Sequence, residues 1–315
     1  LAENGHEVRL WSAFPQAAAE LAATRENRRF LPGVRLPESV EVTGDDACAL
    51  AGAEMAVSAV PTQFIRRVWQ RLAAHCPRGL AVCSAAKGIE NGTLLRPTQV
   101  LRDVLDGGGQ DRPVAALSGP SIAPEVARGL PATVAVAASD EALAEQVQAF
   151  ITRPYFRVYT NPDLVGVELA GATKNVVAIA AGILDGLAAG VNAKAALLTR
   201  GLAEITRLGV ALGARAETFA GLAGIGDLVT TCFSPVGRNR SFGEAVGSGR
   251  SVDQALAATQ SVVEGVATTA SVVQLARRCG VEMPITEAVH AVLFGGRAPA
   301  EAVSDLMTRP LRSEA

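Results

Sequence analysis

Cysteine, histidine and aromatic residues are all scarce in this sequence. Its 315 residues include five cysteines and three histidines, and phenylalanine, tryptophan and tyrosine together make up 4% of the chain. The cysteines have no C-x-x-C spacing and the histidines are isolated, so neither a disulfide framework nor a metal site is expected. Scattered cysteines are typical of proteins from a reducing compartment, and we therefore expect a cytoplasmic protein.

An excess of charge of one sign is also missing. Lys and Arg number 29 against 31 for Asp and Glu, which gives a net charge of −2. This balance provides no electrostatic basis for binding nucleic acid or an acidic membrane surface. Gly, Asp, Lys or Arg interrupts each apolar run before it reaches the length of a membrane-spanning helix. We therefore predict no nucleic-acid partner and no membrane insertion.

What the sequence does have is a hydrophobic content of 49%, dominated by Ala, Val and Leu. In the first half of the chain, short apolar runs alternate with helical patterns. The predicted strands are Glu7–Trp11, Glu54–Val60, Leu80–Ser84, Val114–Ser118, Thr133–Ala137 and Tyr155–Tyr159. Such alternation is typical of a mostly parallel sheet covered on both faces. We therefore predict an α/β, Rossmann-like domain over residues 1–160.

Strand patterns stop after this point, and residues 161–315 are predicted to form an all-helical domain. After a turn at Asn161-Pro162, one long helix is expected to run to Asn192, and an amphipathic helix is expected over Ala195–Leu212. Ser251 and Gln254 form a capping box that begins another helix. Further along, a helix is predicted over Val263–Arg278, and Gly280 is suited to end it. Pro299 then opens a last short helix.

A single lysine, Lys174, interrupts the apolar helix that begins this second domain. Its neighbours on the same helix face are Ala170, Gly171, Val177 and Ala178, which cannot pair with an ammonium but allow another surface to approach closely. Desolvation, and a second cation nearby, would lower the pKa of Lys174 towards the range of a general base. The alternative is a lysine that extends along the helix edge to reach solvent.

Polar groups also follow three of the predicted strands, where ligands bind in doubly wound sheets. These are Pro61-Thr62, Lys87 in the segment SAAKGIE, and Gly119-Pro120-Ser121 in SGPSIAPE. The Gly-Pro-Ser turn leads into a helix start whose backbone N–H groups favour an anionic or polar ligand. Each segment alone could be an ordinary loop with a capping serine, but three on one edge indicate a site.

A second cluster lies between Gly221 and Gly243. Asp227 is surrounded by Gly, Leu and Val, and Arg238-Asn239-Arg240 opens a helical segment after a Pro/Gly loop. Arginine and asparagine donors at a helix N-terminus suit a phosphate group. A solvated basic patch would explain Arg240 equally well, but it does not explain Asp227.

The G-x-G-x-x-G loop of dinucleotide-binding domains is absent from the sequence. The opening residues LAENGHEVRLW read as the end of a helix, a turn at Asn4-Gly5 and a strand. The place of such a loop is one helix upstream of Asn4-Gly5, and we therefore expect it to precede Leu1.

Taken in order, these motifs resemble the bacterial NAD(P)-dependent glycerol-3-phosphate dehydrogenases. The resemblance rests on SAAKGIE, SGPSIAPEVARGLP, ELAGATKNVVAIAAG, the block over residues 198–213, GLAGIGDLVTTC with GRNRSFG, and VVEGVATT, and it covers essentially the whole chain. It implies reversible oxidation of sn-glycerol 3-phosphate to dihydroxyacetone phosphate with NAD or NADP, feeding phospholipid synthesis. It implies a phosphorylated small-molecule substrate and is compatible with a homodimer. It also implies that roughly twenty residues, which include the first strand and the Gly-rich loop, precede Leu1.

The resemblance also implies residue roles. Lys174 would accept the proton of the C2 hydroxyl, Lys87 would contact the substrate and keep Lys174 poised, and Asp227 would hold and orient Lys174. The implied substrate-binding residues are Lys87, Gly119, Ser121, Lys174, Asn175, Asp227, Thr231, Gly237, Arg238 and Asn239. The implied cofactor-binding residues are Trp11, Lys87, Ala123, Arg238, Val262 and Glu264. No metal is implied.

Two departures from the family pattern affect these expectations. Gly237 stands where the family usually has a serine, which removes one hydroxyl donor from the phosphate site. After Trp11, the segment Ser12-Ala13-Phe14 lacks the usual basic residue that meets the adenosine ribose, so the preference between NAD and NADP stays open. Two alternatives are a related hydroxyacid dehydrogenase with the same two-domain plan and a catalytically inactive nucleotide-binding fragment.

Overall fold

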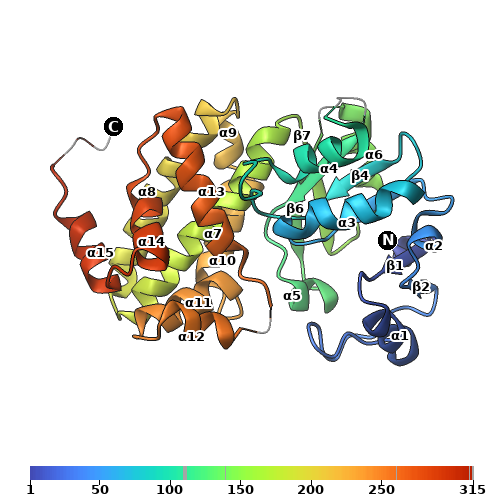
Figure 1. The fold of residues 1–315 in the computed structure, drawn as a ribbon, viewed down its shortest axis with the longest axis horizontal. Coiled ribbons are helices and arrows are strands. Elements are labelled where there is room, and N and C mark those ends of the chain that lie inside the picture. The colour runs from blue at the N-terminus through green and yellow to red at the C-terminus, as the bar shows by residue number, and fades with distance from the viewer. Residues whose placement is uncertain (109–111, 139, 260, 312, 314–315) are drawn as a thin grey trace.

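All seven strands of the described chain lie in its first half, and the second half of that part is helical (Figure 1). The computed structural model describes residues 1–315 except 109–111, 139, 260, 312 and 314–315. The predicted order of a sheet domain followed by a helical domain is therefore confirmed. The predicted boundary between residues 160 and 161 falls near the end of β7 (Phe156–Asn161).

The strands form two sheets. The larger sheet has the order β3 (Met55–Ser58), β4 (Ala81–Ser84), β5 (Val114–Ser118), β6 (Ala132–Ala138) and β7. All its neighbouring pairs are parallel except β5 and β6, which agrees with the predicted mostly parallel sheet. Residues in β4 are buried on both faces because helices cover the sheet.

The smaller sheet pairs β1 (Val8–Trp11) with β2 (Val40–Thr43) in parallel, and Val8 lies opposite Val40. No strand was predicted at β2, although its four residues, VEVT, alternate apolar and polar side chains and are mostly β-branched, which is a short strand signal. Pairing with β1 supplies the backbone hydrogen bonds that this short segment cannot make alone. Within the described residues, β1 pairs only with β2 and β3 only with β4.

Helices connect the strands and cover the sheets. In the first half these are η1 (Ala2–Asn4), α1 (Pro15–Thr24), α2 (Asp46–Leu50), η2 (Thr62–Phe64), α3 (Ile65–Leu72), η3 (Ala73–His75), α4 (Pro97–Asp106), α5 (Ala123–Ala127) and α6 (Glu141–Ile151). The face of α3 that carries Ile65, Val68, Trp69 and Leu72 is buried against the sheet, as its spacing requires.

The second half is built around α7 (Leu164–Gly186), nearly all of whose residues are buried. The helices that follow are α8 (Gly190–Ala211), α9 (Ala216–Phe219), η4 (Leu222–Gly226), α10 (Asp227–Phe233), α11 (Arg238–Gly247), α12 (Val252–Ala257), α13 (Glu264–Cys279), α14 (Pro284–Phe294) and α15 (Pro299–Met307). Three predicted helix boundaries are confirmed: the capping box at Ser251 begins α12, Gly280 ends α13, and Pro299 begins α15.

The helix predicted after the Asn161-Pro162 turn starts where expected, but the prediction that it continues to Asn192 was wrong. Asn161 belongs to β7, and α7 ends at Gly186. The chain then turns through Ala188, whose φ of 52° is left-handed, and Gly190, whose φ is 85°. Apolar composition continues through this turn, so hydrophobic periodicity could not reveal it.

Glycines allow α7 and α11 to pack very closely. A Cβ added to Gly182 on α7 would lie 1.9 Å from the backbone oxygen of Arg240, and one added to Gly243 on α11 would lie 2.1 Å from that of Ile179. Neither position can hold a larger residue without separating the helices. This contact fixes α11, and with it the Arg238–Asn239 pair, against the helix that carries Lys174.

By length and hydropathy, α7 could also cross a membrane. Its most apolar window has a mean hydropathy of 1.4, although 94% of that window is buried inside the protein. As predicted, Gly171 and Lys174 interrupt the apolar residues of this helix. The helical segments over residues 216–233 and 238–247 are bent by 49° relative to each other, and together they are also long and apolar enough to cross a membrane if counted as one span. Burial of this kind is what the central helix of a helical core shows.

Candidate active site

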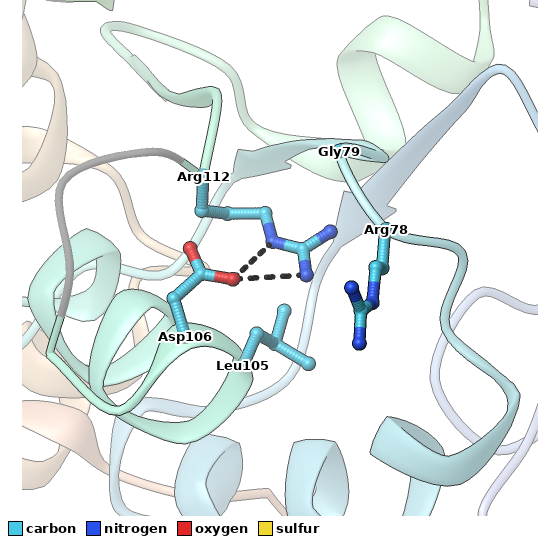
Figure 2. A pocket seen from close by; sticks show the side chains of 5 residues that line it. All are labelled: Arg78, Gly79, Leu105, Asp106 and Arg112. Carbon is cyan, nitrogen blue, oxygen red and sulfur yellow. Dashed lines mark hydrogen bonds and ion pairs between the residues drawn. The ribbon is translucent and has the colours of Figure 1, made fainter.

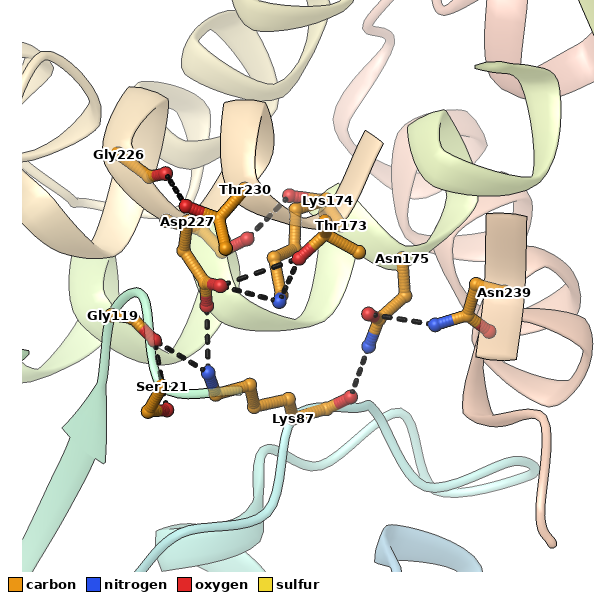
Figure 3. Close-up of polar contacts among 12 residues, drawn as sticks. Lys87, Gly119, Ser121, Thr173, Lys174, Asn175, Gly226, Asp227, Thr230 and Asn239 are labelled. Carbon is orange, nitrogen blue, oxygen red and sulfur yellow. Dashed lines mark hydrogen bonds and ion pairs between the residues drawn. The ribbon is translucent and has the colours of Figure 1, made fainter. Parts of the chain in front are cut away.

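Lys174 lies buried where the helical half meets the sheet. It is 5% exposed, and its Nζ donates to Asp227 Oδ1 at 2.7 Å and to Thr231 Oγ1 at 2.5 Å (Figure 3). Both partners belong to α10, which begins directly after η4 and packs against α7. The alternative prediction, that the Lys174 side chain extends along the helix edge to solvent, is therefore wrong.

The second lysine reaches the same carboxylate from the sheet. Lys87 follows β4, and its Nζ donates to Asp227 Oδ2 at 2.7 Å and to the backbone oxygen of Gly119 at 3.0 Å (Figure 3). Asp227 is 2% exposed and therefore binds one ammonium through each oxygen. The structure thus brings together Lys174, Lys87 and Asp227, the three residues expected to be catalytic.

The charges in this cluster shift one another's protonation. Burial lowers the pKa of Lys174 to about 8, with the Lys87 ammonium as the second cause, while Asp227 acts in the opposite direction. Burial raises the pKa of Asp227, but the ammonium groups of Lys87 and Lys174 outweigh it and leave the pKa below its ordinary value. With a pKa of about 8, roughly a tenth of Lys174 is neutral at pH 7. Lys174 can therefore both accept and return a proton near neutrality.

A missing side chain on α7 makes room for Lys87. A Cβ added to Gly171 would lie 2.7 Å from Ser118 Oγ, at the end of β5, and 3.5 Å from Lys87 Cγ. The carboxyl ends of β4 and β5 therefore approach the face of α7 that carries Lys174. This is the close approach expected from the small residues around Lys174.

A chain of amide hydrogen bonds holds the backbone of Lys87. Asn175 Nδ2 donates to the Lys87 carbonyl at 2.8 Å, and Asn239 Nδ2 donates to Asn175 Oδ1 at 2.9 Å (Figure 3). The Gly265 N–H then donates to Asn239 Oδ1 at 3.0 Å. Asn175 and Asn239, both expected to bind substrate, thereby connect α7, α11 and α13 to the Lys87 loop.

Glu264, at the start of α13, holds the other side of this loop. Its Oε1 accepts from the Thr62 N–H at 2.7 Å, and its pKa is raised by burial in spite of hydrogen bonds from the Thr62 and Lys87 backbones. Thr268 lies one turn further along α13, and its buried Oγ1 has no hydrogen-bond partner among the described residues. A Cβ on Gly88 would lie 3.2 Å from that hydroxyl. Thr268 was not among the predicted site residues, although its spacing from Glu264 puts it on the same helix face.

The remaining expected site residues lie around this centre at different distances from it. Ser121 Oγ donates to the Gly119 carbonyl at 3.1 Å, so both lie beside Lys87, and Ala123 begins α5 on the exposed side. Gly237 is the N-cap of α11, and Arg238 is exposed and donates to the Val262 carbonyl at 3.2 Å.

Trp11 is separate from the lysine cluster. It ends β1, in the smaller sheet, and its Nε1 donates to Asp46 Oδ1 at 3.1 Å. No hydrogen bond among the described residues joins it to Lys87 or Lys174. Trp11 therefore belongs to a different part of any shared ligand site.

A surface hollow lies away from the cluster of Lys174, Lys87 and Asp227. It has a volume of about 380 Å³ and is lined by Arg78, Gly79, Leu105, Asp106 and Arg112 (Figure 2). Arg112 and Leu80 precede β5 and β4, so this hollow adjoins the amino ends of the strands, opposite Lys87. The Arg112 guanidinium already donates to Asp106 and to the carbonyls of Pro77 and Leu80. We assign it no catalytic role.

Comparison with known proteins gives one consistent result. The family described as NAD-dependent glycerol-3-phosphate dehydrogenase N-terminus matches residues 1–144, and the corresponding C-terminus family matches residues 163–304. A glycerol-3-phosphate dehydrogenase [NAD(P)+] from Geobacter sp. (strain M21) is 51% identical over all of this chain and 93% of its own length. One from Salinibacter ruber is 50% identical over all of this chain and 92% of its own length.

The chain belongs to the NAD-dependent glycerol-3-phosphate dehydrogenase family. A crystal structure of the glycerol-3-phosphate dehydrogenase from Coxiella burnetii has a TM-score of 0.93, with 38% identity over 98% of this chain and 94% of that one. The resemblance inferred from the sequence motifs is thereby confirmed, and so is the predicted fold class. No group of three or more potential metal ligands occurs among the described residues.

The residues present fit part of the dinucleotide that the family uses. Trp11 with Asp46 offers a ring and a carboxylate at the end of β1, while Glu264 and the unpartnered Thr268 hydroxyl lie at the loop beyond β3. Parallel strand ends of this kind are where dinucleotides bind in Rossmann domains. The described residues contain no G-x-G-x-x-G loop, and we assign no contact to the pyrophosphate.

Proposed function

We propose that this chain interconverts sn-glycerol 3-phosphate and dihydroxyacetone phosphate with NAD(P), and that Lys174 is its general base. One observation carries the assignment: two lysines from different halves of the molecule meet on one buried carboxylate, Asp227. When bound, the oxidised cofactor accepts the hydride from C2. Lys174 Nζ, in its neutral form, takes the proton of the C2 hydroxyl, so that the C2–H bond breaks as the carbonyl forms.

Asp227 and Lys87 serve this proton transfer in different ways. Asp227 holds Lys174 in place through Oδ1, and it stabilises the ammonium once the proton has arrived. The Lys87 ammonium lowers the pKa of Lys174, so that the proton is released again near neutrality. A cation at Lys87 also stabilises the negative charge that develops on the substrate oxygen.

Recognition of the substrate phosphate is assigned to the start of α11. The exposed Arg238 guanidinium and the N-terminal N–H groups of a ten-residue helix provide donors and a favourable dipole for an anion. Gly237 offers no hydroxyl there, so the backbone carries more of this interaction. The buried Asn239 supports the site mainly through Asn175 and Gly265.

The direct test is reduction of dihydroxyacetone phosphate measured with NADH and with NADPH in parallel. Lys174→Ala should abolish turnover while cofactor binding is retained. A matched control is Lys194→Ala, because Lys194 is also a buried lysine and is paired with Asp185 at 2.7 Å, outside the site. Near-normal rates for Lys174→Ala, or faster turnover of 3-hydroxy acids than of glycerol 3-phosphate, would contradict the proposal.

Arg238→Ala tests the phosphate site separately. It should weaken glycerol 3-phosphate binding by roughly tenfold or more, since a hydrogen bond to a charged group contributes about 1.5–3 kcal/mol. The control is Arg250→Ala, at an exposed arginine beyond the end of α11. Equal losses for glycerol and glycerol 3-phosphate would count against a phosphate role. A supply of glycerol 3-phosphate to phospholipid synthesis in the cytoplasm, and a homodimer, stay predictions.

A further inference from the structure

The segment that follows β1 lacks charge at the point where dinucleotide-binding domains distinguish their cofactors. In such domains an acidic residue binds the adenosine 2′-hydroxyl of NAD, or a nearby arginine accommodates the 2′-phosphate of NADP. Here the sequence after the strand is Trp11-Ser12-Ala13-Phe14, with neither kind of residue.

The tertiary structure brings both charges to this segment from elsewhere. Arg71, in the last turn of α3, donates through Nη1 to the Ala13 carbonyl at 3.0 Å. Its guanidinium lies over the Trp11 ring, 5.3 Å from the ring centroid. Nε and Nη2 of Arg71 each donate to Asp46, at the start of α2, at 2.6 Å.

Arg71 is fixed in this position without being enclosed. Its side chain is 41% exposed, whereas that of Asp46 is 19% exposed. Asp46 accepts from Trp11 as well as from Arg71, so both of its oxygens are already in use. Arg71 uses three of its five N–H groups in these contacts and keeps two for a ligand.

We propose that Arg71 is the residue that binds the 2′-phosphate of NADP, with Asp46 and Trp11 as the groups that position it. The inference rests on the proposed use of a nicotinamide dinucleotide and adds a specificity residue to it. An arginine bound to the carbonyl of Ala13 replaces the basic residue missing from that segment. A guanidinium is suited to this role because it can donate two parallel hydrogen bonds to a phosphate.

Binding of cofactor fragments tests this without any turnover. Titration calorimetry on the full chain would compare 2′,5′-ADP, which carries the 2′-phosphate, with 5′-AMP, which differs from it only in lacking that phosphate. Arg71→Ala should weaken binding of 2′,5′-ADP about tenfold or more and leave that of 5′-AMP unchanged. Arg67→Ala is the matched control, at an exposed arginine one turn earlier on α3 that lies near Phe64 rather than Trp11. Arg71→Lys should recover only part of the loss, because an ammonium cannot donate in the bidentate geometry.

Several outcomes would overturn the inference. These are an equal loss for the two nucleotides in Arg71→Ala, no loss for either, the same loss in Arg67→Ala, or failure of the unaltered chain to bind 2′,5′-ADP. Selective loss in a chain that does not reduce dihydroxyacetone phosphate would refute the proposed function and leave the role of Arg71 standing. Conversely, reduction of dihydroxyacetone phosphate by the unaltered chain, with no selective loss of 2′,5′-ADP binding in Arg71→Ala, would support the proposed function and refute the role of Arg71.

Discussion

Two buried carboxylates in the helical half, Asp227 and Glu204, have opposite protonation behaviour. They are 2% and 3% exposed, so the cost of burying their charge is similar. The pKa of Asp227 lies below its ordinary value because two ammonium groups face it. Burial raises the pKa of Glu204 to about 7, since its main partners are the backbone N–H groups of Ile285 and Thr286. The charge of the partners decides the sign.

The two partner sets also show what each carboxylate is for. Glu204 Oε1 accepts from Ile285 N at 2.6 Å and Oε2 from Thr286 N at 3.3 Å, so it caps the first turn of α14. Asp227 instead binds cations that come from both halves of the molecule. One carboxylate completes a helix end, and the other assembles a site.

Removal of the Asp227 charge should have the largest effect. Asp227→Asn leaves Lys174 and Lys87 without a counter-charge, and both lose the acceptor that positions them. We expect kcat/KM to fall by roughly 10²–10⁴-fold, the range in which a positioned acid–base group contributes. The same amide substitution at the other carboxylate, Glu204→Gln, should leave kcat/KM unchanged. Similar losses in the two variants would remove the functional distinction between them.

Glu204→Gln should instead change stability, in a pH-dependent way. The folded pKa of about 7 exceeds the ordinary 4.5, so the folded protein holds more protons between these values and the stability contribution of Glu204 is lost as pH rises through 7. The variant lacks this loss and should be more stable than the unaltered chain at pH 8, by up to about 3 kcal/mol. Urea unfolding of both proteins at pH 5 and pH 8 measures the difference between their free energies of unfolding. Other titrating groups are common to both proteins, so their contributions cancel in this difference. A pH-independent difference would show that Glu204 does not titrate in this range.

Lys87 and Asp227 should act on the pKa of Lys174 in opposite directions: the ammonium of Lys87 lowers it, and the carboxylate of Asp227 raises it. For the unaltered chain, kcat/KM for glycerol 3-phosphate oxidation should rise with pH and level off above about 8, and that for the reverse reaction should fall there. Lys87→Met removes a cation, so the pKa of Lys174 should rise by about one unit or more. Carbon NMR of reductively methylated Lys174 reads this pKa even where turnover is slow. An unchanged or lower pKa in the variant would contradict the assigned coupling.

The smallest effect is expected from the amide chain. Asn239→Ala breaks the hydrogen bonds to Asn175 and Gly265 and lets the Lys87 loop move, without removing any charge. The pKa of Lys174 should rise by a few tenths of a unit, in the same direction as in Lys87→Met but by less. A purely structural role would lower stability and leave that pKa in place.

Much of this site could be predicted from the sequence because its residues are conspicuous in their local setting. Lys174 interrupts an apolar helix, Lys87 follows a buried strand, and Asp227 stands among glycines and apolar residues. Parallel strands put their carboxyl ends at one edge of a sheet, and this rule predicts that Lys87 lies near the segment from Gly119 to Ser121.

Other features have no local signal. The break after Gly186 lies within continuous apolar sequence. Asn175 and Asn239 look like ligand donors in the sequence, whereas the structure shows that they bond to each other. Arg71 is an unremarkable basic residue on an amphipathic helix until the fold places it over Trp11.

The sequence by itself determined the order of elements, the alternation of strands and helices, and which side chains are available for proton transfer, because these follow from hydrophobic periodicity and residue chemistry. Only the tertiary structure decided which charges meet. A pKa near 8 at Lys174, a capping role for Glu204 and the contact between Arg71 and the Ala13 carbonyl all depend on residues distant in the chain. Electrostatic effects act through space, and at short range they depend on where packing has placed each group.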